Sequence, residues 1–294
     1  MHNACERSLS RRQLIEGALA LAAGVVTLGP GRVLGEDRDE CTRWAFLSDT
    51  HVASDPDNRY RGFYPYRNLR EIAGQIAYTP PDGVVITGDL AWIKGEIQAY
   101  ENLKTLLAPV TAQRPVYLGL GNHDDRGDFS WAFRRSPRNG MAVADKHIAA
   151  AVAGPMRMII LDSLLVDSAA GLLGQSQRTW LKTFLDASDD RPTILFFHHR
   201  PRIDLLDTPG LFEIIAPVVK VKAVVYGHSH KLRFSEYKGI HMINLPATGF
   251  NMAGSEPVGW MEARLTQQGG EFVLHALSGN RKMDGCCERL CWRT

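Results

Sequence analysis

Five short clusters of polar residues in this chain contain side chains that can bind metal ions. In chain order they are Asp49-Thr50-His51, Gly88-Asp89, Gly121-Asn122-His123-Asp124, His198-His199 and Gly227-His228-Ser229-His230. Imidazole nitrogens combined with carboxylate and amide oxygens favour transition metals over ions that prefer ligands made only of oxygen. The clusters therefore indicate a metal site, and the elements around them must explain how they meet.

Most of these clusters follow an apolar run that we predict to be a β-strand. The predicted strands are Trp44 to Leu47, Val84 to Thr87, Val116 to Gly119, Met158 to Leu161, Thr193 to Phe197 and Ala223 to Tyr226. The predicted helices between them are Tyr66 to Tyr78, Glu96 to Leu107, Gln175 to Ala187 and Leu211 to Val218. This alternation predicts an α/β domain. Loops at the carboxyl ends of strands in such a sheet converge where ligands bind, so we expect the clusters to meet there.

Taken singly, each cluster has a simpler explanation. Aspartate at a strand end is often a turn residue or a helix cap, and a lone histidine is often structural. A shared site explains five such clusters in order better than five coincidences. Two other classes remain as alternatives, a metal-binding module without catalysis and a mononuclear iron oxygenase. The second leaves Asp89 and Asn122 unexplained.

The last third of the chain differs from the part before it. The segments Leu232 to Glu236, His241 to Leu245, Gly259 to Leu265 and Glu271 to Leu277 resemble antiparallel strands with glycine-containing turns, which favours a second sheet. We find no internal repeat and no linker in the mature chain. We therefore expect one domain over residues 36–280, followed by a cysteine-containing tail over residues 281–294.

Composition limits the classes of function. The chain has 294 residues, of which 45% are hydrophobic and 22% charged, and these values are typical of a soluble globular protein. Its formal net charge of +2, with no basic run after the N-terminal segment, gives no nucleic-acid-binding patch. The sequence does not indicate an oligomeric state.

Residues 1–35 have the pattern of an export signal. Arg7, Arg11 and Arg12 precede an apolar stretch that is shorter than a membrane span needs. The segment from Ser10 to Leu14 resembles a twin-arginine signal, which implies recognition by the export machinery. We expect a periplasmic or extracellular protein, or a membrane-tethered one if the signal is not cleaved.

Removal of this signal would leave four cysteines, at positions 41, 286, 287 and 291. An even number of cysteines is compatible with disulfides in an oxidising compartment. A bond from Cys41 to the C-terminal cluster would connect the two ends of the mature chain. Free thiols on a frayed tail, or less plausibly a zinc site formed by cysteines, are the alternatives.

The chain resembles the calcineurin-like metallophosphoesterases from about Trp44 to Leu277. The family motifs D-x-H, G-D, G-N-H-D, H-H-x-P and G-H-x-H match the five clusters in order. The stretch from Asn244 to Ala247 is most similar to the cyclic-nucleotide and glycerophosphodiester phosphodiesterase branch. Trp92 stands where purple acid phosphatases have a metal-bound tyrosine, which disfavours that branch. The resemblance implies a four-layer α/β/β/α sandwich.

The resemblance also implies two divalent or trivalent transition-metal ions, such as Fe, Mn or Zn. The first metal would be held by Asp49, His51, Asp89 and His230. The second metal would be held by Asp89, Asn122, His198 and His228. Asp89 would bridge the two ions. His199 competes with His198 for the fourth motif, and the family alignment favours His198.

The implied reaction is hydrolysis of a small phosphate ester by a metal-bridging hydroxide. We assign His123 to protonation of the leaving group and Asp124 to orientation of the His123 ring, although Asp124 can equally be a turn or cap residue. Phosphodiesters are favoured as substrates, with phosphomonoesters as the alternative.

The substrate-binding residues are unknown from the sequence. Arginine and aromatic side chains near the motifs can contact a phosphate or line a substrate wall, or they can be solvated and structural. The arginines are Arg59, Arg61 and Arg126, and the aromatic residues are Tyr60, Phe63, Tyr64, Tyr66, Trp131 and Phe133.

Overall fold

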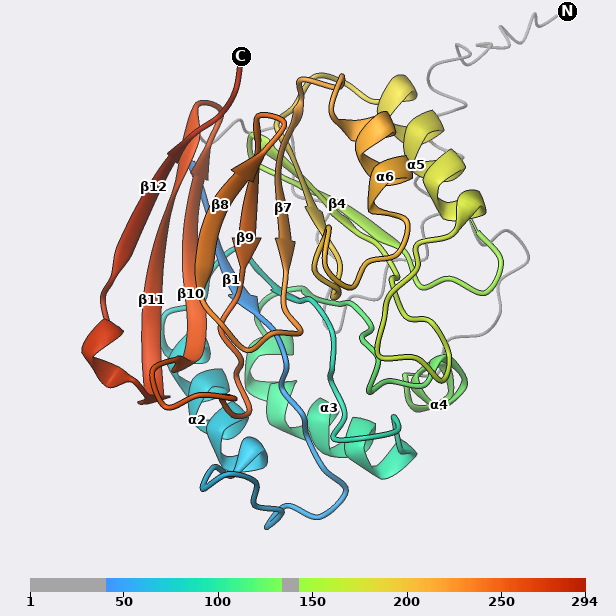
Figure 1. Cartoon of the computed structure of the whole chain (residues 1–294). Coiled ribbons are helices and arrows are strands. Elements are labelled where there is room, and N and C mark those ends of the chain that lie inside the picture. The colour runs from blue at the N-terminus through green and yellow to red at the C-terminus, as the bar shows by residue number, and fades with distance from the viewer. Residues whose placement is uncertain (1–40, 134–142) are drawn as a thin grey trace, which may run out of the picture.

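Two six-stranded mixed sheets form the centre of the protein. The computed structural model describes residues 41–133 and 143–294. The first sheet has the order β12-β11-β10-β1-β2-β3, and the second has the order β4-β5-β6-β7-β9-β8 (Figure 1). The strands of the first sheet are β1 (Cys41–Leu47), β2 (Gly83–Ile86), β3 (Val116–Leu118), β10 (Pro257–Thr266), β11 (Gly269–Gly279) and β12 (Cys287–Cys291). Those of the second are β4 (Ala149–Ala153), β5 (Met156–Ile160), β6 (Thr193–Phe196), β7 (Val221–Tyr226), β8 (Arg233–Tyr237) and β9 (Ile240–Asn244).

Helices cover the outer face of each sheet. The first sheet packs against α2 (Pro65–Tyr78), α3 (Ile97–Thr111) and α4 (Arg126–Ala132), and the second against α5 (Gln175–Ala187) and α6 (Thr208–Ile215). Figure 1 shows the two groups of helices on opposite sides of the sheets. Three buried apolar clusters fill the spaces between the layers, and the middle one lies between the two sheets. The predicted four-layer α/β/β/α sandwich is confirmed.

The parallel strands form where the sequence has short continuous apolar runs. All residues of β2, β6 and β7 are buried, as expected of strands with both faces covered. The six predicted strands and four predicted helices are all present, with bounds that differ by a few residues. Three elements were not predicted, because β4 is rich in alanine, α4 has seven residues and β12 is largely exposed. None of them has a strong apolar period.

A second sheet is present, but the strands of the last third are divided between the two sheets. Strands β8 and β9 join the second sheet, where β9 pairs parallel with β7. Strands β10 and β11 instead extend the first sheet antiparallel to β1. The turn between β8 and β9 follows the local signal, because Lys238 and Gly239 both have positive φ. Local alternation predicts a strand but does not specify its partner.

The C-terminal segment also differs from the predicted tail. After a short 3-10 helix (Arg281–Met283), strand β12 pairs with β11 at the edge of the first sheet. The Trp292 side chain is buried, and Arg293 donates hydrogen bonds to backbone carbonyls that include Val218 and Val221. Residues 287–293 are therefore integrated into the sandwich.

Of the alternatives left open for the cysteines, the structure favours free thiols over a disulfide from Cys41 to β12, for a geometric reason. Strands β10 and β11 lie between Cys41 and β12, a distance of three strand spacings or roughly 14 Å. A disulfide requires Cα atoms less than about 7 Å apart. Cys41, Cys286, Cys287 and Cys291 are free and exposed in the structure.

The expected export signal over residues 1–35 lies outside the described residues. Among the helices that the structure does describe, none has the length and apolar character needed to cross a membrane.

Candidate metal centre

The polar clusters meet at the carboxyl ends of the parallel strands of both sheets. Asp49 and His51 follow β1, Asp89 follows β2, and the loop containing Asn122 follows β3. His198 follows β6, while His228 and His230 follow β7. Two backbone hydrogen bonds show how close these loops lie, since Asp49 N donates to Gly88 O at 3.0 Å and Gly227 N donates to His198 O at 3.0 Å. The geometry predicted from strand order is therefore present.

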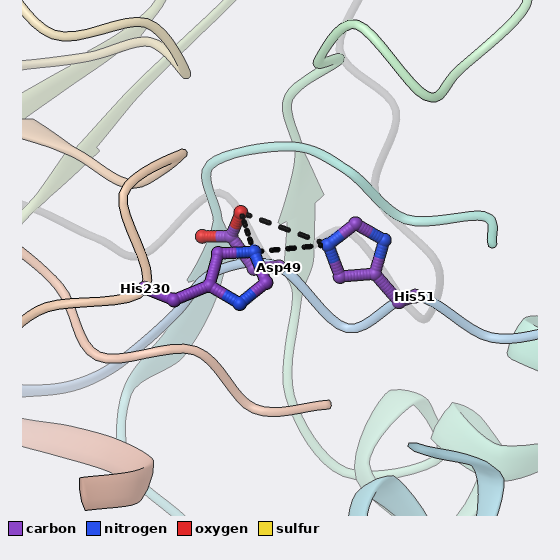
Figure 2. Close-up of side chains that lie close together, drawn as sticks. All are labelled: Asp49, His51 and His230. Atoms are coloured by element: carbon purple, nitrogen blue, oxygen red, sulfur yellow. Dashed lines mark hydrogen bonds and ion pairs between the residues drawn. The ribbon is translucent and has the colours of Figure 1, made fainter. Parts of the chain in front are cut away.

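The first group of ligand atoms comes from Asp49, His51 and His230 (Figure 2). Nε2 of His230 lies 3.2 Å from Oδ1 of Asp49 and 3.2 Å from Nε2 of His51. Nε2 of His51 lies 3.9 Å from the same aspartate oxygen. Figure 2 shows the three side chains pointing toward one another. The spacing allows one metal ion to contact all three.

The second group contains Asp89, His198 and His228. Oδ2 of Asp89 lies 3.1 Å from Nε2 of His198 and 3.8 Å from Nε2 of His51. One carboxylate oxygen therefore faces ligand atoms of both groups. Asn122, the remaining predicted ligand, has a buried Oδ1 with no hydrogen-bond partner.

The backbone at these positions is unusual for residues other than glycine. Five predicted ligands have positive φ values between 45° and 68°, namely Asp49, His51, Asp89, His228 and His230. Such left-handed conformations are uncommon and cluster at functional sites, where the surrounding structure compensates their cost. No pattern in the sequence indicates these left-handed conformations.

Glycines in the motifs allow the loops to approach one another closely. A Cβ atom at Gly121 would lie 2.2 Å from Oδ1 of Asp89, and one at Gly227 would lie 2.4 Å from Oδ2 of Asp49. Both distances are too short for any other residue to fit without displacing an aspartate that is a predicted metal ligand.

The candidate ligands are anchored through one atom and leave another free. Oδ2 of Asp49 accepts hydrogen bonds from Ser48 Oγ at 2.5 Å and from His228 N at 3.1 Å. Its Oδ1 is buried without a partner, as is Nε2 of His198. Nδ1 of His230 donates to Phe250 O at 2.6 Å, which leaves Nε2 free to bind. Unpartnered buried N and O atoms of this kind fit the binding of transition-metal ions.

The electrostatics of the metal-free site also fit cation binding. Burial opposes ionisation of Asp49, but His230 and His198 outweigh it and hold the pKa of Asp49 below its usual range. Burial likewise opposes the charged form of His198, yet Asp89 and Asp49 raise the pKa of His198 to about 9. Burial lowers the pKa of His51 to about 4. The positive charge of protonated His198 compensates the negative charge of Asp49 and Asp89. A metal ion that binds through His198 would displace this proton.

His123 lies at the edge of the cluster. Its backbone N donates to Oδ1 of Asp89 at 2.9 Å, and its Nε2 lies 4.0 Å from Oδ2 of Asp89. The ring packs perpendicular to His51 with centroids 5.0 Å apart, and the side chain remains 35% exposed. His51, Asp89 and His123 are also close enough together to hold an ion. The position of the His123 ring is compatible with either of two roles, metal ligand or proton donor. Our assignment of His123 as the proton donor therefore stays a prediction.

The contacts of Asp124 differ from the predicted contact with the His123 ring and fit the alternative, a residue that holds the loop. Its carboxylate accepts hydrogen bonds from the backbone N atoms of Leu90, Ala91 and Gly121 and from the hydroxyl of Tyr100, at 2.9–3.2 Å. In the described part of the chain, no hydrogen bond joins it to the His123 ring. Burial, followed by the charge of Asp89, raises the pKa of Asp124 to about 7. Asp124 therefore connects the loops after β2 and β3.

We expect Asp124→Ala to destabilise the protein by on the order of 3 kcal/mol, because four donors would lose their acceptor and each buried unsatisfied donor costs about 1–3 kcal/mol. Urea unfolding of the metal-free protein measures this change. Asp124→Asn keeps one acceptor oxygen and should cost less. Equal stability of wild type and Asp124→Ala would show that the contacts are unimportant.

The ring of His199 has Ser163 as its hydrogen-bond partner. Its Nδ1 lies 2.8 Å from Oγ of Ser163. Burial and the neighbouring His198 lower its pKa to about 2, so the ring is neutral. His198, by contrast, lies against both Asp49 and Asp89. This arrangement favours His198 over His199 as the ligand.

The candidate substrate residues have distinct positions. Arg126 forms a two-point ion pair with buried Asp162 at 2.6 and 2.9 Å and so contacts the protein interior. Tyr60 packs edge-on against Trp92 and Phe250, with centroids 5.0 and 4.8 Å away. Phe250 also packs 4.8 Å from the ring of His51. These aromatic side chains lie beside the first ligand group.

Sequence reasoning missed several residues of the site. Phe250, Ser48, Ser163 and Asp204 all contact predicted metal residues or their neighbours. Only Ser48 had a local signal, since it precedes the first motif directly. The other contacts depend on tertiary packing.

A family model described as calcineurin-like phosphoesterase matches residues 42–232, a range that includes every predicted site residue. The chain is 26% identical over 214 residues to 3',5'-cyclic adenosine monophosphate phosphodiesterase CpdA of Pseudomonas aeruginosa, covering 69% of this chain and 74% of that protein. It is 30% identical over 239 residues to a cAMP/cGMP dual specificity phosphodiesterase of Mycobacterium tuberculosis. That match covers 77% of this chain and 74% of the relative. It is 27% identical over 222 residues to glycerophosphodiester phosphodiesterase GpdQ of Enterobacter lignolyticus. That match covers 69% of this chain and 76% of the relative.

Solved structures show the same fold. A dimetal phosphatase from Danio rerio superposes with a TM-score of 0.66 at 14% identity, covering 87% of this chain and all of that one. The purple acid phosphatase PPD1 from yellow lupin seeds gives a TM-score of 0.59 at 16% identity, covering 80% of this chain and 51% of that one.

Proposed function

Because this chain belongs to the calcineurin-like phosphoesterase family, and is therefore a hydrolase of phosphoric ester bonds, we propose that it is a dinuclear metal-dependent phosphodiesterase. The observation that carries the dinuclear part is the position of Asp89. Its Oδ2 lies 3.8 Å from Nε2 of His51 and 3.1 Å from Nε2 of His198, so one carboxylate could serve both groups of ligands.

The ligand assignment follows these two groups. Asp49, His51, Asp89 and His230 would hold the first ion, and Asp89, Asn122, His198 and His228 the second. Bound transition-metal ions such as Fe, Mn or Zn would supply positive charge for the phosphoryl oxygens and a water of lowered pKa as nucleophile. The relatives named as phosphodiesterases support a diester as the substrate.

The side chains of this protein would provide the remaining steps. His123, partly exposed beside Asp89, would protonate the oxygen of the departing alcohol. Buried Asp124 would fix the loops that carry Asp89 and His123. Tyr60 and Trp92 lie on the side of His51, where they can contact the apolar part of an ester.

Protein reconstituted with Mn²⁺ or Zn²⁺ should hydrolyse bis-p-nitrophenyl phosphate, and faster than p-nitrophenyl phosphate. A faster monoester reaction would favour the alternative, a phosphomonoesterase of the same fold. Inactivity toward both esters with several metals and pH values would contradict a catalytic function and leave a non-catalytic metal-binding module. Asp89→Ala protein purified in the same way controls for contaminating phosphatases.

Export is part of the proposal and rests on the sequence of residues 1–35. The double change Arg11→Lys and Arg12→Lys should leave the protein in the cytoplasmic fraction, because twin-arginine recognition depends on that pair. Immunoblots of periplasmic and cytoplasmic fractions measure the distribution. Arg7→Lys lies outside the pair and serves as the control. Unchanged export of the double variant would argue against a twin-arginine signal.

A further inference from the structure

The two histidines of the fifth strand-end motif, His228 and His230, have different second partners. His230 donates from Nδ1 to Phe250 O at 2.6 Å and directs Nε2 toward Asp49. His228 instead has its Nε2 3.4 Å from Oδ2 of Asp204, in the loop between β6 and α6. An imidazole that gives one N–H to a carboxylate or carbonyl offers its other nitrogen to a metal. The hydrogen bond of His230 leaves its Nε2 available, and a proton on Nε2 of His228 facing Asp204 would leave Nδ1 of His228 available.

Asp204 is held firmly in this position. Its carboxylate accepts hydrogen bonds from the backbone N of Arg200 at 2.5 Å and from Nε of Arg200 at 2.6 Å. Its backbone O accepts from Gly171 N at 2.8 Å, and its backbone N donates to Arg200 O at 3.2 Å. A side chain fixed at both carboxylate oxygens can orient a neighbour, because it has little freedom to rotate away.

Other rings limit how His228 can turn. The ring of His199 lies 5.0 Å from it, and His198 packs perpendicular to it with centroids 5.2 Å apart. His199 is itself fixed by Ser163. Among the described residues, Asp204 is the only one whose carboxylate forms an ion pair with Nε2 of His228, so we expect the orientation of the His228 ring to depend on Asp204.

We propose that Asp204 is a positioning residue for the second metal site. It fixes the tautomer and ring orientation of His228, so that His228 binds through Nδ1 whereas His230 binds through Nε2. This inference rests on the proposed dinuclear centre. Its effect should be confined to one of the two ions, since the first ligand group of Asp49, His51 and His230 has no ion pair or hydrogen bond to Asp204 within the described residues.

Zn²⁺ titration of the metal-free full chain tests the proposal directly. We expect wild type to bind two equivalents, and Asp204→Ala to bind one equivalent as before and the other about 10–100-fold more weakly. Asp204→Asn keeps the shape of the side chain and serves if the alanine variant does not fold. Asp186→Asn is the matched control, because Asp186 forms an i,i+4 ion pair with Lys182 at 2.6 Å on the exposed surface of α5.

Nitrogen NMR of imidazole-labelled, Zn²⁺-loaded protein gives a readout independent of activity. His228 should coordinate through Nδ1 and His230 through Nε2, and Asp204→Ala should change the His228 signals alone. Two equivalents bound by Asp204→Ala with wild-type affinity, or Nε2 coordination by His228, would overturn the inference and leave the dinuclear centre intact. A wild type that binds fewer than two equivalents would overturn the dinuclear proposal and this inference together.

Discussion

Asp89→Ala should lose bound metal and lower kcat/KM for a phosphodiester by at least about 10³-fold, because the stabilisation supplied by bound metal is worth several kcal/mol. Asp89 is the predicted shared ligand, and its Oδ2 lies 3.1 Å from Nε2 of His198 and 3.8 Å from Nε2 of His51. Its other oxygen accepts the backbone N–H of His123. The change therefore removes a shared ligand and an anchor of the proton donor.

Metal stoichiometry by mass spectrometry and steady-state kinetics measure the two effects. Asp186→Asn removes an exposed carboxylate remote from the cluster and should behave as wild type. Circular dichroism establishes that Asp89→Ala is folded. Two equivalents of metal in folded Asp89→Ala protein would show that Asp89 is not a bridging ligand.

The apolar pattern of the sequence was sufficient to predict an α/β domain and the meeting of the polar clusters, while the family resemblance predicted the four layers. Buried parallel strands appear as short apolar runs, as at β2 and β7, and their polar residues follow directly. The position of Asp89 after β2 thus required only local information. Its approach to His198, more than a hundred residues later, followed from the rule that ligands bind at the carboxyl ends of such strands.

The features that were not predicted depend on tertiary contacts. Asp124 follows His123 in sequence, but its carboxylate contacts Leu90 and Ala91 because the loops after β2 and β3 are adjacent. A disulfide between Cys41 and the C-terminal cysteines was compatible with the sequence. In the first sheet, however, strands β10 and β11 lie between Cys41 and β12. Asp204 had no signal at all, since its contact with His228 joins loops from different strands.

His123→Ala should keep both metal ions and lower turnover by about 10²–10⁴-fold, the usual contribution of a positioned general acid. The loss should be larger for alkyl esters than for p-nitrophenyl esters. A strongly basic alkoxide needs a proton as it departs, whereas p-nitrophenolate does not. The partial exposure of His123, with Nε2 4.0 Å from Oδ2 of Asp89, places its ring where an ester can reach it.

Comparison of bis-p-nitrophenyl phosphate with p-nitrophenyl alkyl and dialkyl phosphates measures this dependence on the leaving group. His241→Ala is the control, because His241 contacts the backbone of Cys291 and lies near the start of β9, away from its carboxyl end. An equal loss for all esters would argue against proton donation. If His123→Ala instead released an ion, the grouping of His123 with His51 and Asp89 would reflect coordination, and the ring would be a metal ligand.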